Sequence, residues 1–237
     1  MTRPAGTAGS GLSAALDALH AGRPVGLLDD LVPAPAAAGA IVVAGDRIDT
    51  ATMALLVRVT SGVVAVAAPA ERLDALRIPP MPGGHGDPGR PGFAVAVDLA
   101  TGITTGISAR DRSATVRALA DPSSSAEAFT RPGHVLPVRS RDGGVLARAR
   151  PAEAAMDLCR AAGREPVAAL ATAVDDAGGA GSAAVLESVA ARHPMPLVRV
   201  SEVLSHRRAE IARVLGDLGA GRGVLIGGTA LGGTAVA

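Results

Sequence analysis

Short apolar runs alternate with helical patterns along most of the chain, and this alternation restricts the fold more than any other feature. Short apolar runs indicate buried strands, whereas apolar residues that recur every three or four positions indicate helices. The strand-like runs are 24–29, 40–44, 63–67, 93–98, 135–138, 167–174 and 197–200. The helical patterns are 11–20, 51–59, 109–119, 153–162, 183–192 and a helix from Ser201 toward Leu218. The alternation predicts an α/β fold: a single-domain α/β sandwich with one mixed sheet and helices on both of its faces.

The side chains available for the core of this fold are small. The 237 residues are 48% hydrophobic, but they include two Phe and neither Trp nor Tyr. Ala, Val and Leu must therefore fill the core, and the length suffices for one large domain. We expect residues 1–10 to be a flexible lead-in, 11–208 to be the folded domain, and 209–237 to hold the end of a C-terminal helix and a Gly/Ala-rich tail.

Charge and composition argue against several classes of partner. All 23 basic residues are Arg, the formal net charge is +1, and no basic stripe with stacking aromatic residues occurs, so no nucleic-acid binding is expected. No signal-peptide pattern and no apolar run of membrane-spanning length is present, so we expect a soluble cytoplasmic protein that does not bind membranes. Cys159 is the only cysteine and lies in a helical pattern, which favours a core side chain.

Polar side chains gather in two short runs between residues 98 and 139. Thr104, Thr105 and Ser108 stand just before the helical pattern 109–119, and Arg131 and His134 stand on a predicted loop before the run 135–138. Hydroxyl groups at a helix start, a guanidinium and an imidazole would suit an anionic or oxygen-rich ligand. The simpler alternative is that Ser108 caps the helix and His134 is an ordinary histidine.

Two further places could contribute to a site. Asp29 and Asp30 follow the predicted strand 24–29, and ligands of open α/β sheets bind at the carboxyl ends of strands. Residues 79–92 contain five Pro and five Gly, which predicts a loop, and this loop carries His85 and Asp87. These two side chains either reach the pocket or are simply solvated.

The order of short motifs resembles that of the 3,4-dihydroxy-2-butanone 4-phosphate synthase family. The resemblance runs collinearly over roughly residues 15 to 208, with Thr-Thr-Gly-Ile-Ser at 104–108 and Arg-Pro-Gly-His at 131–134 as its most specific parts. The other matching motifs are at 22–25, 71–74, 78–81, 97–98, 111–112, 119–122, 143–146 and 206–207. The resemblance implies a homodimer with the active site at the subunit interface. It also implies an enzyme that converts ribulose 5-phosphate to a four-carbon ketone phosphate and formate.

The chain departs from the family pattern at three catalytic places. The family's acidic loop, which holds the sugar phosphate and a magnesium ion, corresponds to the uncharged segment 31–39. The family's second magnesium ligand, a His, corresponds to Pro151, and the Thr after it to Ala152. The family's catalytic Glu corresponds to Thr172. Ala and Pro side chains offer no oxygen ligands to Mg²⁺, so we expect neither a metal nor another cofactor.

These departures lead to a hypothesis of a family member repurposed for specialised metabolism. The reaction would be a metal-independent isomerisation, elimination, cyclisation or C–C rearrangement of a relatively apolar small molecule in a homodimer. His134 and Asp30 would be catalytic. The substrate-binding residues would be Arg131, Thr104, Thr105, Ser108 and Arg148, the last of which matches a family Arg.

Two alternatives remain open. A catalytically inactive binding subunit would also have lost its metal ligands. A genuine synthase could have relocated its ligands to Asp29, Asp30, Asp175 and Asp176.

Overall fold

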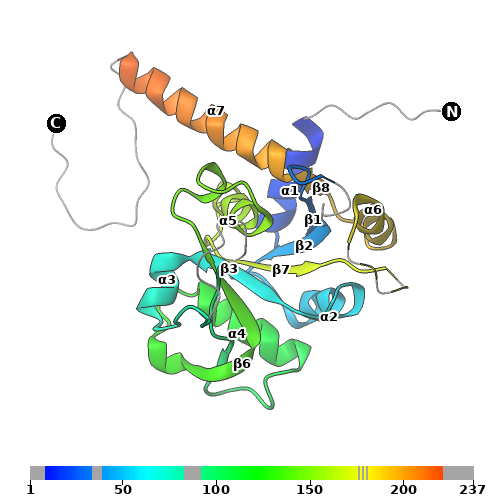
Figure 1. Cartoon of the computed structure of the whole chain (residues 1–237), viewed down its shortest axis with the longest axis vertical. Coiled ribbons are helices and arrows are strands. Elements are labelled where there is room, and N and C mark those ends of the chain that lie inside the picture. Colours follow the sequence, from blue (N-terminus) through cyan, green and yellow to red (C-terminus); the bar gives the residue numbers. More distant parts are fainter. Residues whose placement is uncertain are drawn as a thin grey trace.

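The strands form one mixed sheet in the order β4-β6-β3-β7-β2-β1-β8, with β5 paired to β6 off this path. This computed structural model describes residues 9–33, 39–82, 92–175, 177, 179 and 181–220 (Figure 1). The strands are β1 (Val25–Leu28), β2 (Gly39–Ala44), β3 (Ala65–Pro69), β4 (Gly92–Phe93), β5 (Val97–Leu99), β6 (Phe129–Ser140), β7 (Ala168–Thr172) and β8 (Leu197–Arg199). The predicted α/β class and mixed sheet are confirmed.

The strand pairing brings several chain segments to one edge of the sheet. β2 pairs antiparallel with β1 and β7, and β3 pairs antiparallel with β7 but parallel with β6. In this register Leu28 lies opposite Gly39, and Ala40 lies opposite Thr172. The carboxyl ends of β1 and β7 therefore lie beside the amino ends of β2 and β3. Residues from four strands thus meet at this edge of the sheet.

Helices cover both faces of the sheet. α2 (Thr50–Val59), α4 (Ala109–Ala120) and α6 (Ala183–Arg192) pack on one face, together with the short α3 (Ala70–Ala75). α1 (Gly9–His20), α5 (Pro151–Ala161) and the start of α7 (Val200–Gly219) pack on the other face. Figure 1 shows α5 and α7 above the sheet and α2 and α4 below it.

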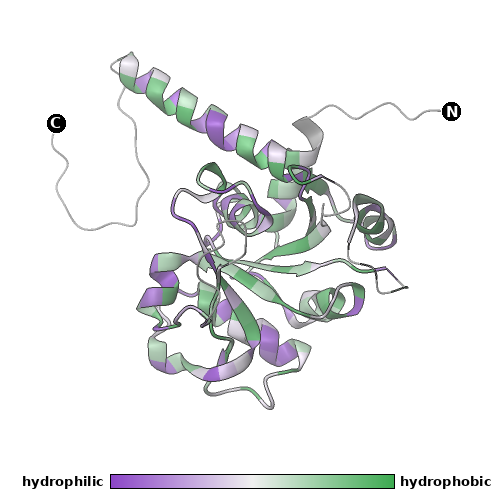
Figure 2. Cartoon of the chain, viewed as in Figure 1, coloured by the Kyte–Doolittle hydropathy of each residue, from purple (hydrophilic) through white to green (hydrophobic). Residues whose placement is uncertain are grey.

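The core is built from small and medium aliphatic side chains, as the composition predicts. Met53, Leu56 and Leu119 are fully buried on one face, and Ala154 and Leu158 of α5 are buried on the other. Figure 2 shows the central strands in hydrophobic colours between helices with polar outer faces. Cys159 belongs to this core, and burial raises the pKa of its thiol, as expected for a structural cysteine.

Two expectations about local structure are wrong. The predicted strand 93–98 is interrupted, because Phe93 ends β4 and Val97 begins β5 beside a register shift. Arg131 and His134 lie within the long strand β6 and not on a loop. The Pro-Gly pair at 132–133 suggested a loop, but a Cβ at Gly133 would lie 2.0 Å from the carbonyl carbon of Val97. Glycine is therefore required where β6 approaches β5 closely.

The start of the last helix also differs from the expectation. Arg199 is the N-cap of α7, and Ser201 lies inside the helix. Both the backbone N–H and the hydroxyl of Ser201 donate to the carboxylate of Asp30, at 3.0 and 2.5 Å. Asp30 thus satisfies a helix-end donor from outside the helix.

Some expectations concern residues outside the described part of the chain. His85, Asp87 and Asp176 are among these residues, as are 1–8 and most of the Gly/Ala-rich tail. In the part of the chain that the structure describes, no helix is both long and apolar enough to cross a membrane.

Candidate functional site

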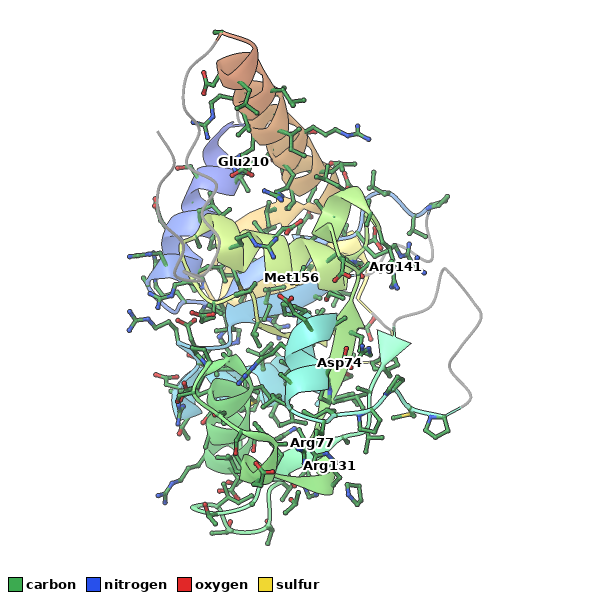
Figure 3. All side chains as sticks on the ribbon, turned by 90° about the vertical axis from the view of Figure 1, so that its left-hand side faces the viewer. Asp74, Arg77, Arg131, Arg141, Met156 and Glu210 are labelled. Atoms are coloured by element: carbon green, nitrogen blue, oxygen red, sulfur yellow. The ribbon has the colours of Figure 1, made fainter. Side chains whose placement is uncertain are left out.

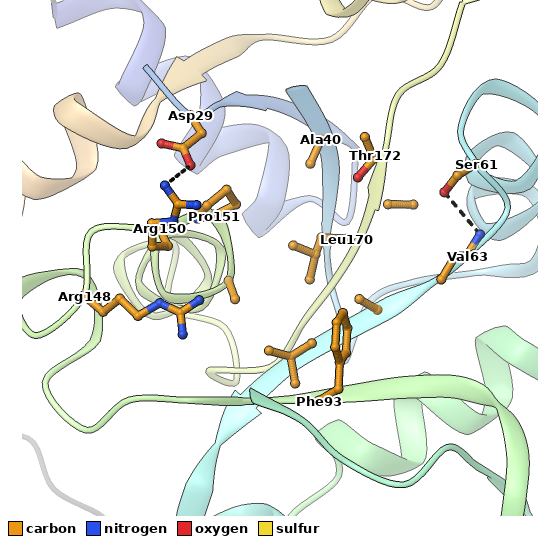
Figure 4. A pocket seen from close by; sticks show the side chains of 14 residues that line it. Asp29, Ala40, Ser61, Val63, Phe93, Arg148, Arg150, Pro151, Leu170 and Thr172 are labelled. Atoms are coloured by element: carbon orange, nitrogen blue, oxygen red, sulfur yellow. Dashed lines mark hydrogen bonds and ion pairs between the residues drawn. The ribbon is translucent and has the colours of Figure 1, made fainter. Parts of the chain in front are cut away.

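A cavity of about 270 Å³ lies at the sheet edge where α5 begins. Figure 4 shows it between the start of α5, the strands β2 and β7, and Phe93 of β4. Its lining residues are Asp29, Ala40, Ser61, Val63, Ala65, Phe93, Val138, Arg148, Arg150, Pro151, Ala152, Leu170, Ala171 and Thr172. The carboxyl ends of β1 and β7 thus contribute to the cavity, as expected for an α/β sheet.

The cavity has one apolar wall and one charged wall. Ala40, Leu170 and Val138 of the sheet, with Phe93, form the apolar wall, and the charged groups stand by α5. Such a shape fits a ligand with a less polar body and one ionised end.

An ion pair between Asp29 and Arg150 forms part of the charged wall. Asp29 is 3% exposed, and its Oδ2 lies 3.3 Å from Nη1 of Arg150. Burial raises the pKa of Asp29, and the nearby Arg150 opposes this rise. The direction of Asp29 follows from strand geometry: it continues the face of β1 that carries Leu27, which packs in the α5 cluster.

Arg148 also lines the cavity and forms an ion pair with Glu153. Glu153 is fully buried, and its Oε2 lies 3.6 Å from Nε of Arg148. The other carboxylate oxygen accepts a hydrogen bond from the backbone N–H of Arg141 at 3.3 Å. Burial raises the pKa of Glu153, and Arg148 partly offsets this rise. The predicted ligand residue Arg148 therefore does lie in the cavity.

A second polar cluster centres on His134. Its Nδ1 lies 2.6 Å from Oδ2 of Asp98, and its backbone N–H donates to Oδ1 of the same carboxylate at 3.0 Å. Asp98 is 6% exposed, whereas the His134 side chain is 41% exposed. Because a carboxylate only accepts, Nδ1 carries the proton, and Nε2 is the nitrogen left for proton exchange.

The loop 104–108 supports this second cluster. Gly106 has φ +85°, and a Cβ there would lie 2.1 Å from Oδ2 of Asp98. Asp111 accepts hydrogen bonds from the Thr104 hydroxyl and from the backbone N–H groups of Thr104 and Gly106. The Thr104 hydroxyl and these other donors lower the pKa of Asp111. Ser108 caps α4 by accepting from the N–H of Asp111, so the simpler interpretation of this serine is confirmed.

The predicted site residues therefore do not lie together. Some belong to the His134 cluster, one lies in the cavity, and Asp30 and Arg131 make contacts that stabilise the fold. His134 contacts Asp98, whereas Thr104 and Ser108 contact Asp111 on the neighbouring helix. Thr105 is exposed on the same loop. Arg148 lies in the cavity. Asp30 supports α7, as described above, whereas its neighbour Asp29 reaches the cavity wall.

Arg131 also has a contact that the sequence did not suggest. Its guanidinium donates to the carbonyl oxygens of Leu76 at 2.6 Å and Phe129 at 3.0 Å, which ties β6 to the end of α3. Figure 3 shows Arg131 near Arg77 at one end of the molecule, well separated from Met156 of α5. The expectation that Arg131 joins Arg148 in one pocket does not hold within a single chain.

Sequence reasoning missed Arg150 and Asp98. Arg150 follows no motif, although its place directly before Pro151 at a predicted helix start was visible. Asp98 ends an apolar run, but its partner is 36 residues away, and only the pairing of β5 with β6 brings the two together.

Comparison with known proteins gives consistent results. A family model described as 3,4-dihydroxy-2-butanone 4-phosphate synthase matches residues 13–206. A protein of that name from Agrobacterium fabrum is 41% identical over 173 residues, which cover 73% of this chain and 81% of the relative. One from Schizosaccharomyces pombe is 50% identical over 133 residues, which cover 56% of this chain and 65% of the relative.

Solved structures agree with the sequence comparison. A crystal structure of 3,4-dihydroxy-2-butanone 4-phosphate synthase in complex with two magnesium ions superposes with a TM-score of 0.75 at 34% identity. The match covers 83% of this chain and 96% of that one. The fold and sequence similarity therefore extend over most of the domain.

The donor groups that the described residues bring to the cavity do not fit a magnesium ion. Mg²⁺ requires hard oxygen ligands, usually with at least one carboxylate. The described cavity wall offers the carboxylate of Asp29 and the hydroxyls of Ser61 and Thr172, and Asp29 already faces the Arg150 cation. Across the described residues, no group of three His, Cys, Asp or Glu side chains is arranged to hold a metal.

Proposed function

Because the chain belongs to the 3,4-dihydroxy-2-butanone 4-phosphate synthase family, we propose that it is an enzyme that binds a small anionic substrate in the cavity beside α5. The observation that carries this proposal is the charged wall formed by Arg148 and Arg150 opposite the apolar wall of β2 and β7. A guanidinium binds a carboxylate or phosphate through paired hydrogen bonds, and the apolar wall accepts the rest of the molecule.

The proposed chemistry is metal-independent proton transfer. His134 exchanges a proton through Nε2, while Asp98 holds the ring by its Nδ1–H and stabilises the imidazolium. Arg148 orients the anionic end of the substrate. A proton transfer next to a carbonyl group can begin an isomerisation, an elimination, a cyclisation or a C–C rearrangement. A role in specialised metabolism would extend this proposal, but the similarity to named synthases favours the family's own reaction over it.

We further propose that two subunits complete each site. The resemblance implies a homodimer with the active site at the interface, and it is supported by His134, which is 41% exposed and does not line the cavity of its own chain. In this arrangement the exposed His134 of one subunit approaches the cavity of the other.

The second candidate function is the reaction of the family, the conversion of ribulose 5-phosphate to a four-carbon ketone phosphate and formate. Identity of 41% to the Agrobacterium fabrum synthase favours it, as does the presence of the 104–108 and 131–134 motifs. The donor groups of the cavity argue against the family's use of magnesium. Ribulose 5-phosphate is therefore the first molecule to test, both as a ligand and as a substrate.

Arg148→Ala tests the proposed substrate site. We expect ribulose 5-phosphate to bind the wild-type protein without Mg²⁺. Its Kd should rise about 10- to 100-fold in the variant, since hydrogen bonds to charged groups contribute about 1.5–3 kcal/mol. Isothermal titration calorimetry measures both values, and Arg192→Ala in exposed α6 is the matched control. Equal Kd values for Arg148→Ala and wild type would contradict the assignment of the cavity.

A further inference from the structure

We propose that the guanidinium of Arg150 is the built-in cation of the cavity and that it binds an oxyanion of the ligand directly, without a divalent metal. This inference deepens the proposed function, because it concerns the same cavity. The ligand class is a small molecule with a carboxylate or phosphate group. The backbone position of Arg150, its contact with Asp29 and the amino end of α5 beside it support this assignment.

The backbone fixes the point from which the Arg150 side chain starts. Arg150 is the N-cap of α5 with extended φ and ψ of −138° and 164°, and Pro151 follows at the first position of the helix. Proline restricts its own φ and also disfavours helical conformation in the residue before it. Pro151 and Ala152 line the cavity, so the amino end of this 11-residue helix faces it. The helix dipole thus favours negative charge at the same place as the guanidinium.

Asp29 holds the guanidinium without neutralising its capacity to bind. The contact is at one nitrogen, Nη1, at 3.3 Å from Oδ2, and the Arg150 side chain remains 37% exposed. Arginine carries five N–H donors, so one ion pair leaves donors for a ligand. Among the described residues, no hydrogen bond of standard geometry reaches the other oxygen, Oδ1, although the backbone N–H of Leu31 is close enough to the carboxyl to lower its pKa. An incompletely satisfied buried carboxylate beside a partly exposed cation indicates a site organised around charge.

A divalent cation and this guanidinium are alternatives for the same place. The carboxylate that could ligate a metal is the one that pairs with Arg150, and the next residue, Pro151, has no ligating atom in its side chain. A metal at Asp29 would lie beside the guanidinium and would be repelled by it. Arg150 instead supplies a planar donor pair that matches carboxylate and phosphate geometry.

Calorimetry with inorganic phosphate, acetate and Mg²⁺ alone tests this inference on the full chain. We expect phosphate or acetate to bind the wild-type protein equally with and without EDTA, and Mg²⁺ alone to give no saturable heat. In Arg150→Gln the Kd of the bound anion should rise at least about tenfold. The Kd of Arg150→Lys should lie between those of the wild type and Arg150→Gln. Arg192→Gln is the matched control, and preference between phosphate and acetate identifies the group that the site takes.

Three results would overturn the inference. These are unchanged anion binding in Arg150→Gln, a requirement for Mg²⁺ in the wild type, and no binding of either anion to the wild type. If Arg148→Ala weakens the binding of ribulose 5-phosphate but Arg150→Gln leaves the Kd of the anion unchanged, the proposed function stands and this inference fails. Circular dichroism of each variant establishes that the substitutions leave the fold intact.

Discussion

If the chain is the enzyme proposed above, replacing His134 with alanine is expected to lower kcat by about 10²–10⁴-fold, because positioned acid–base groups contribute on that scale. The fold should not change. The side chain is 41% exposed, and the backbone N–H that donates to Asp98 is retained in the variant. Steady-state turnover measures the effect, and circular dichroism measures the fold. His193→Ala at the end of α6 is the matched control and should retain full activity.

Asp98→Asn tests whether Asp98 orients the ring of His134 or only stabilises the fold. An amide that donates to Nδ1 would move the ring proton to Nε2, which is the wrong tautomer for a base. We expect kcat to fall and its pH profile to shift, while substrate binding changes little. Full activity of His134→Ala would mean that the proposed role of this residue is wrong. Unfolding of His134→Ala would indicate a structural histidine and favour a binding subunit.

Mixed dimers test whether His134 acts across the interface. His134→Ala and Arg148→Ala each remove one half of every site. If the halves come from different subunits, a mixed dimer contains one intact site and one doubly defective site. Co-expression in equal amounts should then restore about a quarter of wild-type activity by random pairing. No recovery, or a protein with the 23.3 kDa mass of a monomer in light scattering, would contradict the proposed interface.

Asp157→Ala is expected to lower the free energy of unfolding by about 1–3 kcal/mol, because the buried backbone N–H of Val145 loses its acceptor. Asp157 is 1% exposed. Its carboxylate accepts from the backbone N–H of Val145 at 2.8 Å and from Arg160 at 2.6 Å, and it lies 3.7 Å from Nε of Arg207. It thereby joins α5, α7 and the turn that precedes Arg148.

Urea unfolding followed by circular dichroism measures this loss. Asp142→Ala, in the exposed part of the same turn, should change the free energy of unfolding by less than about 0.5 kcal/mol. Asp157→Asn retains an acceptor, so its loss of free energy of unfolding should lie between those of Asp142→Ala and Asp157→Ala. A loss below about 1 kcal/mol for Asp157→Ala would show that the cluster does not secure the turn.

The fold was largely predictable because its strands are short apolar runs and its helices are regular. The helices at 109–119 and 183–192 agree with α4 and α6 to within about one residue. The predictions failed where tertiary contacts override local signals. β6 continues through Pro132 and Gly133 because β5 pairs with it, and no local pattern encodes that pairing.

The site was only partly predictable, because its parts depend on which way neighbouring side chains point. Asp29 and Asp30 are adjacent in sequence but have different partners, Arg150 for Asp29 and Ser201 for Asp30. Leu27 packs in the α5 cluster and Leu28 against the other cluster, so the alternation assigns Asp29 to the cavity face. Arg148, which matches a family motif, lines the cavity, and its role in binding stays a prediction. Arg150 matches no family residue that the sequence identified, and its proposed role follows from its position before α5 and its ion pair with Asp29.

The most direct test of metal-independent chemistry in this cavity is formate release from ribulose 5-phosphate over a range of Mg²⁺ concentrations. The donor groups around Asp29 and Arg150 predict no Mg²⁺-dependent release, and the rate should equal that of the Arg148→Ala variant at every concentration. Formate release that saturates with Mg²⁺, and that Arg148→Ala abolishes, would contradict this account and identify the chain as a magnesium-dependent synthase.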